Sequence, residues 1–492
     1  HTKLLALPAL KKFSGGGFFE FYDGVQGMAD LSSLENLAEI EQLRLVDYAD
    51  FKQFKKLKKI PNLYIDEVLD VSDFVDSFKN IDIGMLGIGN LEGIPDDFPL
   101  LGHLSQSIKN IYVRGGNINE VGDLSFFANL KNLESLKLEH IYDWQKTVDI
   151  GKLGKLEHLR ELHIDGNYDS ESINPITELK GFPALTDLKI GDFLNDLSEI
   201  KHLPALTNLS LSNPTNLGMI QSAVPNLERL DFYANHISDL QPLSFLQSLK
   251  FLDISRVHKI NNFSPIGKLV SLTRLKLDSC DLMTNINFIE KLDHLAYLEI
   301  CSNNKDSEKR VLDLSTLKAC RNRLKNLKLE FINTSVNLNN LPSLLALEEL
   351  SLGFFSSIEN LVSLLTLKNL KKIQFENIDT PIDLSIFSAL PNLKSLNFRG
   401  CNNIKNADYF DSIEKVQVSI KKSYSDIWEE SKGKPFDKEF LVNLETDWVK
   451  EKISTKGEDT NFPWAFEFVR EKNNFEFFIS FFSTIAEKLA EA

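Results

Sequence analysis

Cysteine, methionine and tryptophan are scarce in this chain of 492 residues, which contains four of each. The cysteines are Cys280, Cys301, Cys320 and Cys401. No two of them have the C-x-x-C spacing of zinc or redox sites, and none clusters near an end of the chain, where a disulfide-stapled cap would need them. This usage favours reduced thiols and a cytoplasmic location, with secretion as an effector left open.

Positive charge is also in deficit. Lysine and arginine number 55 against 70 aspartates and glutamates, so the formal net charge is −15 at pH 7. Nucleic acids and anionic membrane surfaces both bind proteins through clustered basic residues. We therefore expect neither as a partner, and we expect another protein instead, with the negative charge favouring a basic one.

Long apolar runs and catalytic motifs are missing as well. No stretch of 18 apolar residues occurs, so no membrane span is expected. The sequence contains no glycine-rich phosphate loop, no H-E-x-x-H and no G-x-S-x-G. These absences predict a non-enzymatic protein without a cofactor, with an activity in residues 421–492 as the alternative.

Regularly spaced leucines are the main positive feature. The pattern L-x-x-L-x-L, with other apolar residues often replacing leucine, returns about seventeen times, and the last copy is placed at 413–418. Apolar residues two apart predict a short strand with one buried face, and a fixed period predicts a stack of such strands. The clearest copies, 21 to 23 residues apart, begin at Leu185, Leu206, Leu227, Leu249, Leu272 and Leu295.

One repeat, from Leu227 to Leu249, shows the expected path of the chain from one strand to the next. Leu230 and Phe232 alternate with polar residues and predict the strand. Pro242 in the following segment predicts a short 3₁₀ or α-helical turn, because proline fixes φ at a helix start.

These repeats resemble those of leucine-rich-repeat proteins, in particular the short repeats of internalins and phosphatase regulators. The resemblance covers about Leu34 to Ile420. It implies an α/β repeat solenoid shaped as a horseshoe, with a parallel sheet on the concave side and 3₁₀ or short helices on the convex side. It also implies that Asn or Cys at the ninth repeat position is structural and bonds the backbone of neighbouring turns. The residues of this ladder are Asn167, Asn235, Cys280, Asn303 and Cys401.

Three segments are expected. Residues 1–33 are predicted to form an N-terminal cap that includes an aromatic strand at Phe18–Tyr22. Residues 34–420 form the solenoid, and residues 421–492, rich in Phe and Trp, form a helical C-terminal cap or module. Within the solenoid, the glycines and prolines between Ile81 and Leu104 predict an irregular loop.

The side chains between the buried leucines should face the concave side, and we expect the binding site there. In the middle of the sheet, aromatic rings stand among carboxylates, which is a composition typical of interaction hot spots. The carboxylates favour a basic partner segment. The predicted partner-binding residues are Asp231, Tyr233, Phe251, Asp253, Asp278, Tyr297 and Glu299.

A second candidate patch comprises Glu161, His163 and Asp165, which alternate along one strand and share its exposed face. A histidine flanked by carboxylates suggests a metal site or an acid–base pair. The neighbouring strands, however, offer Lys137, Glu139, Asp187 and Lys189. Ordinary surface ion pairs are therefore the favoured interpretation, and no metal is predicted.

The predicted function is protein–protein recognition on the concave face. The resemblance implies an inhibitor, an immunity protein or a regulator, and the acidic charge suits a basic enzyme as its target. One alternative is a bacterial effector or toxin whose small C-terminal domain is steered by the repeats. Another is a secreted adhesion or recognition protein. The sequence makes no prediction of the oligomeric state.

Overall fold

A computed structural model describes residues 12–13, 19–22, 38–46, 54, 56–66, 71–91, 98–104, 106–116, 125–141, 153–166, 179, 181–191, 200, 203–303, 310–401, 403–406, 409 and 416–421. The chain divides into two units, His1–Ser423 and Tyr424–Ala492. The second unit, and with it nearly all of the predicted C-terminal module, lies outside the described residues. The fold described below is that of the first unit.

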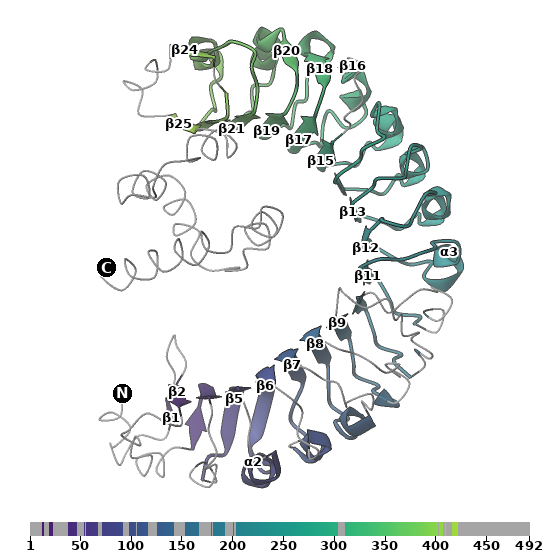
Figure 1. Cartoon of the computed structure of the whole chain (residues 1–492), viewed down its shortest axis with the longest axis vertical. Coiled ribbons are helices and arrows are strands. Elements are labelled where there is room, and N and C mark those ends of the chain that lie inside the picture. Colours follow the sequence, from purple (N-terminus) through teal and green to yellow (C-terminus); the bar gives the residue numbers. More distant parts are fainter. Residues whose placement is uncertain are drawn as a thin grey trace, which may run out of the picture. The chain divides into compact units, whose positions relative to one another are not determined.

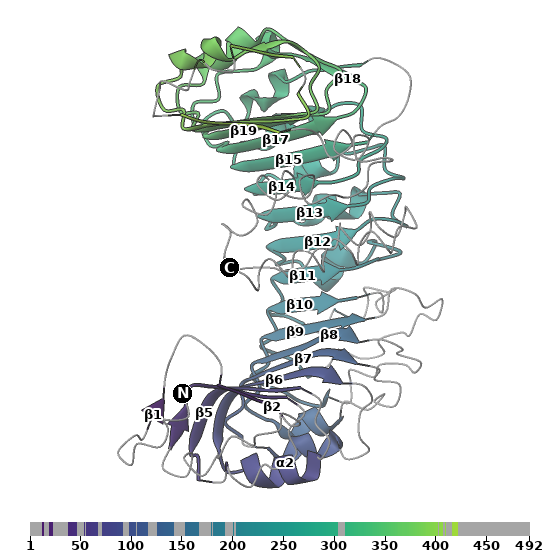
Figure 2. The same ribbon diagram turned by 60° about the vertical axis from the view of Figure 1, so that its left-hand side comes forward.

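One parallel sheet runs through the first unit, and its strands are stacked in the order in which they occur in the chain (Figure 2). All strand pairs in the described part are parallel, and facing leucines of successive repeats are register partners. The strands are β1 (Lys12–Phe13), β2 (Phe19–Tyr22), β3 (Glu39–Ile40), β4 (Gln42–Val46), β5 (Lys59–Asp66), β6 (Asp82–Leu91), β7 (Asn110–Gly116), β8 (Ser135–Ile141), β9 (Glu161–Gly166), β10 (Asp187–Ile190), β11 (Asn208–Leu211), β12 (Arg229–Tyr233), β13 (Phe251–Ser255), β14 (Arg274–Leu277), β15 (Tyr297–Ser302), β17 (Asn326–Phe331), β19 (Glu349–Gly353), β21 (Lys372–Glu376), β23 (Ser395–Arg399) and β25 (Gln417–Lys421).

Short helices return the chain on the opposite side of the sheet (Figure 1). The α-helices are α2 (Val71–Phe78) and α3 (Ile220–Ala223), and the 3₁₀ helices are η3 (Phe98–His103), η4 (Ser125–Asn129), η7 (Gln241–Phe245), η8 (Ile266–Lys268), η9 (Asn287–Lys291), η10 (Ser315–Lys318), η11 (Leu338–Asn340), η12 (Leu361–Thr366) and η13 (Leu384–Ala389). Two small parallel sheets flank them, β16 (Arg310–Leu312), β18 (Thr334–Asn337) and β20 (Ser357–Glu359), and β22 (Ile382–Asp383) and β24 (Ile404–Lys405). None of the helices described is long and apolar enough to cross a membrane.

Strands stack about 4.8 Å apart, closer than helices can pack, so the stack curves with the sheet on its concave face. The predicted solenoid is thus confirmed. Each of the seventeen repeats forms a strand of this sheet, from β4 to β25, and the aromatic strand of the N-terminal segment is β2, which pairs in parallel with β4.

The core runs between the sheet and the helices. In the reference repeat, the predicted apolar positions Leu227, Leu230 and Phe232 are at most 4% exposed. The predicted helical turn is η7, with Pro242 in its first turn. Removing one such buried leucine side chain costs about 2 to 5 kcal/mol, because the packed surroundings close only partly over the gap.

Backbone hydrogen bonds join each coil to the next just before its strand. The amides of Lys250 and Phe251 both donate to the carbonyl of Glu228, at 2.8 and 3.0 Å. The carbonyl of Lys250 in turn accepts from Thr273, at 2.9 Å. This repeated pattern satisfies backbone groups that the stacking would otherwise bury without partners.

Two details of the sequence-based description were wrong. The first half of the predicted loop at 81–104 is strand β6, and Gly87, between Tyr64 and Tyr112, occupies its central position. A Cβ at Gly87 would overlap the Tyr64 ring, so the glycine permits a close approach and does not break the strand. In β25, Val418 and Ile420 are the register partners of the core residues on β23, two positions later than predicted. Alternation with a period of two fits both registers equally well.

Candidate functional site

The predicted partner-binding residues, called the central patch from here on, come together on β12 to β15. Phe251 and Tyr297 belong to an outer row across the sheet that also contains Arg229 and Arg274, and successive members of this row are register partners. The row beside it is Asp231, Asp253, Lys276 and Glu299. Both rows project from the concave face, because the residues between them are buried leucines (Leu230, Leu252, Leu275 and Leu298).

Two aromatic rings of the central patch are open to solvent. Tyr233 is 44% exposed and Phe251 is 38% exposed, while Tyr297 is half-buried. Arginines lie over two of the rings, with Arg274 Cζ 3.8 Å from the ring centroid of Tyr297 and Arg256 Cζ 5.2 Å from that of Tyr233. Such cation–π contacts hold a ring in place while leaving part of its surface free for contact.

Asp253 is the least compensated carboxylate of the central patch. Burial raises its pKa, and the negative charges of Asp231 and Glu299 raise it further. Lys276, its register partner on β14, lowers the pKa through its charge, yet no described residue forms an ion pair with Asp253. Asp231, by contrast, is paired with Arg229 at 3.5 Å. A positively charged side chain of a partner would therefore form its most favourable ion pair in the central patch with Asp253.

Tyr297 and Glu299 form a linked pair at the edge of the patch. The Tyr297 hydroxyl donates to Oε2 of Glu299 at 2.5 Å, and Lys328 from β17 lies 3.3 Å from Oε1 of Glu299. Burial, followed by the bond to Glu299 and its negative charge, raises the pKa of Tyr297 to about 12. Burial alone would raise the pKa of Glu299, but the hydrogen bond and the lysine charge outweigh it and lower that pKa.

The central patch is more balanced in charge than the sequence suggested. Its four carboxylates lie among Arg229, Arg256, Arg274 and Lys276. Asp278, the remaining member, follows β14 and accepts a hydrogen bond from the Ser279 hydroxyl at 3.3 Å. Arg256 was missed because it follows β13 in a left-handed conformation, outside the strand pattern.

The second candidate patch has a different composition from the one predicted. Nε2 of His163 lies 2.9 Å from Oδ1 of Asp187 on β10 and 3.3 Å from Oε1 of Glu161. Asp165 is not part of this group and pairs with Lys189, whose Nζ is 3.3 Å from its Oδ2. Asp187 is the register partner of Glu161, and Lys189 is that of His163. The aspartate therefore lies diagonally across from the histidine, and the two side-chain rotamers bring its Oδ1 to Nε2 of His163.

The lysines of the neighbouring strands do form the predicted surface ion pairs. Lys137 on β8 lies 2.8 Å from Oε1 of Glu161, and Lys189 pairs with Asp165. Burial by itself would raise the pKa values of Glu161 and Asp187. Hydrogen bonds, including those from Lys137 to Glu161 and from His163 to Asp187, lower both pKa values instead, so both side chains are carboxylates at neutral pH.

The ninth-position ladder is partly described. Cys280 and Cys401 are buried, Asn235 is half-buried and Asn303 is exposed, while Asn167 lies outside the described residues. Burial raises the pKa of the Cys280 and Cys401 thiols above the usual range, which makes them poor nucleophiles. The structural role of the ladder as a whole stays a prediction.

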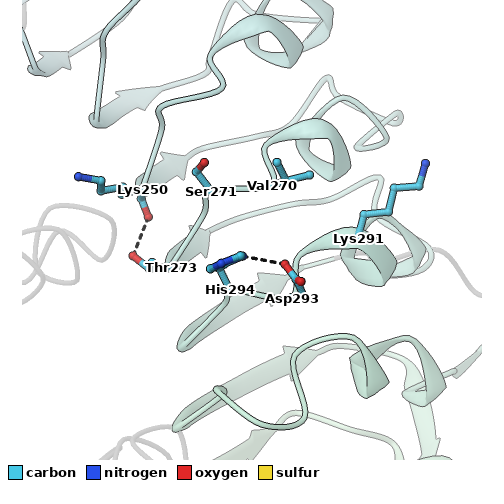
Figure 3. A pocket seen from close by; sticks show the side chains of 7 residues that line it. All are labelled: Lys250, Val270, Ser271, Thr273, Lys291, Asp293 and His294. Carbon is cyan, nitrogen blue, oxygen red and sulfur yellow. Dashed lines mark hydrogen bonds and ion pairs between the residues drawn. The ribbon is translucent and has the colours of Figure 1, made fainter.

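A pocket lies on the side of the solenoid, in the turns that precede β13, β14 and β15 (Figure 3). Its lining residues are Lys250, Val270, Ser271, Thr273, Lys291, Asp293 and His294. His294 is 2.7 Å from its neighbour Asp293, and the Thr273 hydroxyl donates to the carbonyl of Lys250 at 3.0 Å. The Thr273 hydroxyl is thus bonded to the backbone. A nucleophilic hydroxyl would instead be bonded to the histidine, which would act as its base.

No family model matches the chain. Lumican of Homo sapiens is 27% identical over 201 residues, which are 40% of this chain and 51% of lumican. Lumican of Bos taurus is 26% identical over 203 residues, which are 40% of this chain and 50% of that protein. The chain therefore spans about half the length of the curated relatives it matches.

Two solved structures were compared with the chain, and one of them, TLR13, supports the same fold. TLR13 in the TLR13–ssRNA13 complex is 15% identical, with a TM-score of 0.53 over 80% of this chain and 57% of that chain. An LRR protein of Leptospira interrogans is 18% identical, with a TM-score of 0.48 over 75% of this chain and 91% of that chain. The likeness to TLR13 shows the fold alone. The fold of this chain is the leucine-rich-repeat solenoid that its repeats predict.

Proposed function

We propose that this protein is a non-enzymatic recognition module that binds another protein on its concave face. The single observation that carries the proposal is the arrangement around Asp253. This carboxylate has no ion-pair partner among the described residues and lies on the same strand as Phe251, whose ring is 38% exposed. A docked cation would relieve the repulsion at Asp253, and the rings of Phe251 and Tyr233 would bury apolar area in the same step.

The partner segment that fits this patch is basic and partly apolar. A lysine or arginine would pair with Asp253, while an aliphatic or aromatic side chain beside it would pack on Phe251. Because the net charge of the whole chain is −15, a basic partner is also attracted from a distance. An inhibitor, immunity protein or regulator of a basic enzyme is the role that suits these properties best.

A cytoplasmic location belongs to the same proposal. All four cysteines are buried and free, so the solenoid needs no oxidising compartment to complete its core.

The test is affinity capture from a lysate of the native organism with three baits. These are the wild-type chain, the variant Tyr233→Ala/Phe251→Ala, and the control variant Phe245→Ala/Val362→Ala. The control removes two exposed apolar side chains, 51% and 63% exposed, from the helical side of the solenoid. We expect a basic protein to be retained by wild type and control and lost from the patch variant.

Other outcomes would overturn parts of the proposal. A partner retained equally by all three baits would place binding outside the central patch. A partner released by ribonuclease would identify RNA as the ligand, which is a necessary control because the structurally similar TLR13 is in complex with ssRNA13. An enzymatic activity of the full chain that survives in the patch variant would contradict the non-enzymatic assignment.

A further inference from the structure

Three side-chain atoms that can bind a metal ion lie close together where β9 and β10 are adjacent. Nε2 of His163, Oε1 of Glu161 and Oδ1 of Asp187 all lie within 4.8 Å of one another, and the two oxygens are 3.3 and 2.9 Å from the nitrogen. Ligands around a tetrahedral zinc ion, at about 2.0 to 2.1 Å from it, are about 3.4 Å apart. Small rotations of the Glu161 and Asp187 side chains therefore suffice to place one ion among the three atoms.

The second oxygen of each carboxylate is held by a neighbouring strand. The Ser135 hydroxyl on β8 donates to Oε2 of Glu161 at 2.6 Å, and Nδ2 of Asn208 on β11 donates to Oδ2 of Asp187 at 3.0 Å. These bonds orient both carboxylates so that the remaining oxygens point toward His163. Metal-binding carboxylates are oriented in the same way, by hydrogen bonds to groups that do not touch the metal.

The electrostatics of this region favour an added cation. On β8, β9 and β10, the carboxylates of Glu139, Glu161, Asp165 and Asp187 outnumber the ammonium groups of Lys137 and Lys189. These four carboxylates exceed the two ammonium groups by two negative charges, which a divalent ion would neutralise.

We propose that Glu161, His163 and Asp187 form a binding site for a divalent transition-metal ion on the concave face. The imidazole nitrogen favours Zn²⁺ and similar ions over Mg²⁺ or Ca²⁺, which prefer oxygen ligands only. Three protein ligands leave a coordination position open, and it faces the concave side, where water or a partner's side chain completes the shell. This site lies on different strands from the central patch and does not rest on the proposed function.

Lys137 determines how tightly the ion binds. Its Nζ lies 2.8 Å from the same Glu161 oxygen that the metal requires, so the ammonium group and the ion compete. Replacing Lys137 with the uncharged, similarly long methionine should therefore strengthen metal binding. A surface ion-pair network without a metal function predicts no such gain, so this variant separates the two interpretations.

Isothermal titration with zinc chloride tests the proposal, using the full chain freed of metal by a chelator. We expect one saturable site in wild type that is lost in His163→Ala and Asp187→Asn and is tighter in Lys137→Met. Ser135→Ala and Asn208→Ala should each weaken it about 10-fold, the usual effect of removing an orienting hydrogen bond. The control His258→Ala, which breaks a single histidine–carboxylate pair of 2.8 Å with Asp281, should bind as wild type does.

Circular dichroism establishes that each variant is folded. If His163→Ala does not fold, the nearly isosteric Asp187→Asn and the surface variant Lys137→Met decide the matter. No saturable binding to wild type would overturn the proposal, and so would zinc binding that is unchanged in both Asp187→Asn and Lys137→Met.

Discussion

Asp231 and Asp253 are register partners on β12 and β13, so two carboxylates occupy neighbouring positions in the middle of the concave face. Facing like charges destabilise a sheet. Burial and these neighbouring negative charges raise the pKa of Asp253. Such an uncompensated charge lowers the stability of the free protein. Residues of this kind are typical of binding sites, where a partner supplies the opposite charge, and not of positions that serve stability alone.

Replacing Asp253 with asparagine should stabilise the free protein while weakening partner binding. The change keeps the shape of the side chain and removes the repulsion, a gain of about 0.5 to 1 kcal/mol at pH 7. Thermal unfolding followed by circular dichroism measures it as a higher midpoint. Asp379→Asn, at an exposed aspartate between β21 and β22, should leave the midpoint unchanged.

The same variant has a defined pH dependence. Because the folded-state pKa of Asp253 is raised, the folded state binds a proton more readily than the unfolded state, and this group's contribution to stability falls as pH rises through that pKa. The advantage of Asp253→Asn should therefore be present at pH 7 and vanish at a pH below the ordinary aspartate range. A variant that is less stable than wild type at pH 7 would contradict this account of Asp253.

Gly87 and Tyr64 should be energetically coupled. Gly87→Ala places a methyl group against the Tyr64 ring, and overpacking of this kind costs about 1 to 3 kcal/mol. In the background Tyr64→Ala the same change should cost little, since the obstructing ring is gone. A double-mutant cycle measured by denaturant unfolding gives the coupling, and additive effects of the two changes would show that the ring does not limit the strand.

Tyr297 should ionise at a pH well above that at which an ordinary tyrosine ionises. Its pKa of about 12 predicts that the difference in phenolate absorbance between wild type and Tyr297→Phe appears near pH 12 and not near pH 10. Between these values the neutral phenol favours the folded state, so the stability that Tyr297 contributes is lost as pH rises from 10 to 12. Glu299→Gln should lower the pKa of Tyr297, because it removes the negative charge beside the hydroxyl.

The four thiols should be unreactive in the folded protein. Cys280 and Cys320 are fully buried and Cys301 and Cys401 are 8% exposed, and burial raises the pKa of each thiol. A thiol-specific chromogenic reagent should react with none of them in the folded protein at neutral pH, and with all four after unfolding. Rapid modification of Cys280 or Cys401 in the folded state would argue against their structural role in the ladder.

The repeats allowed most of the fold to be predicted, because each leucine pattern dictates a strand with one buried face. Prediction failed where the pattern is locally degenerate. At β25, the apolar residues Val416, which immediately precedes the strand, Val418 and Ile420 alternate without a break. Two registers therefore bury equivalent side chains, and only pairing with β23 selects one. In β6, Gly87 lies against the Tyr64 ring and Gly84 against the carbonyl of Pro61, both on the preceding strand β5, and no local pattern reveals these contacts.

The candidate sites were predictable only in part, for a related reason. Alternation placed Phe251, Asp253 and Tyr297 on the concave face, and the register of four strands was needed to bring them together. The cross-strand partner of His163 is Asp187, 24 residues away, and the nearer Asp165 in the sequence is paired with Lys189. Contacts between strands depend on the register and on side-chain rotamers, so a single strand's sequence does not contain them.

The most direct test of the central claim is the affinity of the captured partner for wild type, Asp253→Asn and Tyr233→Ala/Phe251→Ala, measured by surface plasmon resonance. The account predicts that the double variant binds at least about 30-fold more weakly, as for hot-spot residues worth 2 kcal/mol or more, and that Asp253→Asn also binds more weakly despite being more stable. The control Phe245→Ala/Val362→Ala should match wild type. Equal affinities for all four proteins would contradict binding at the central patch.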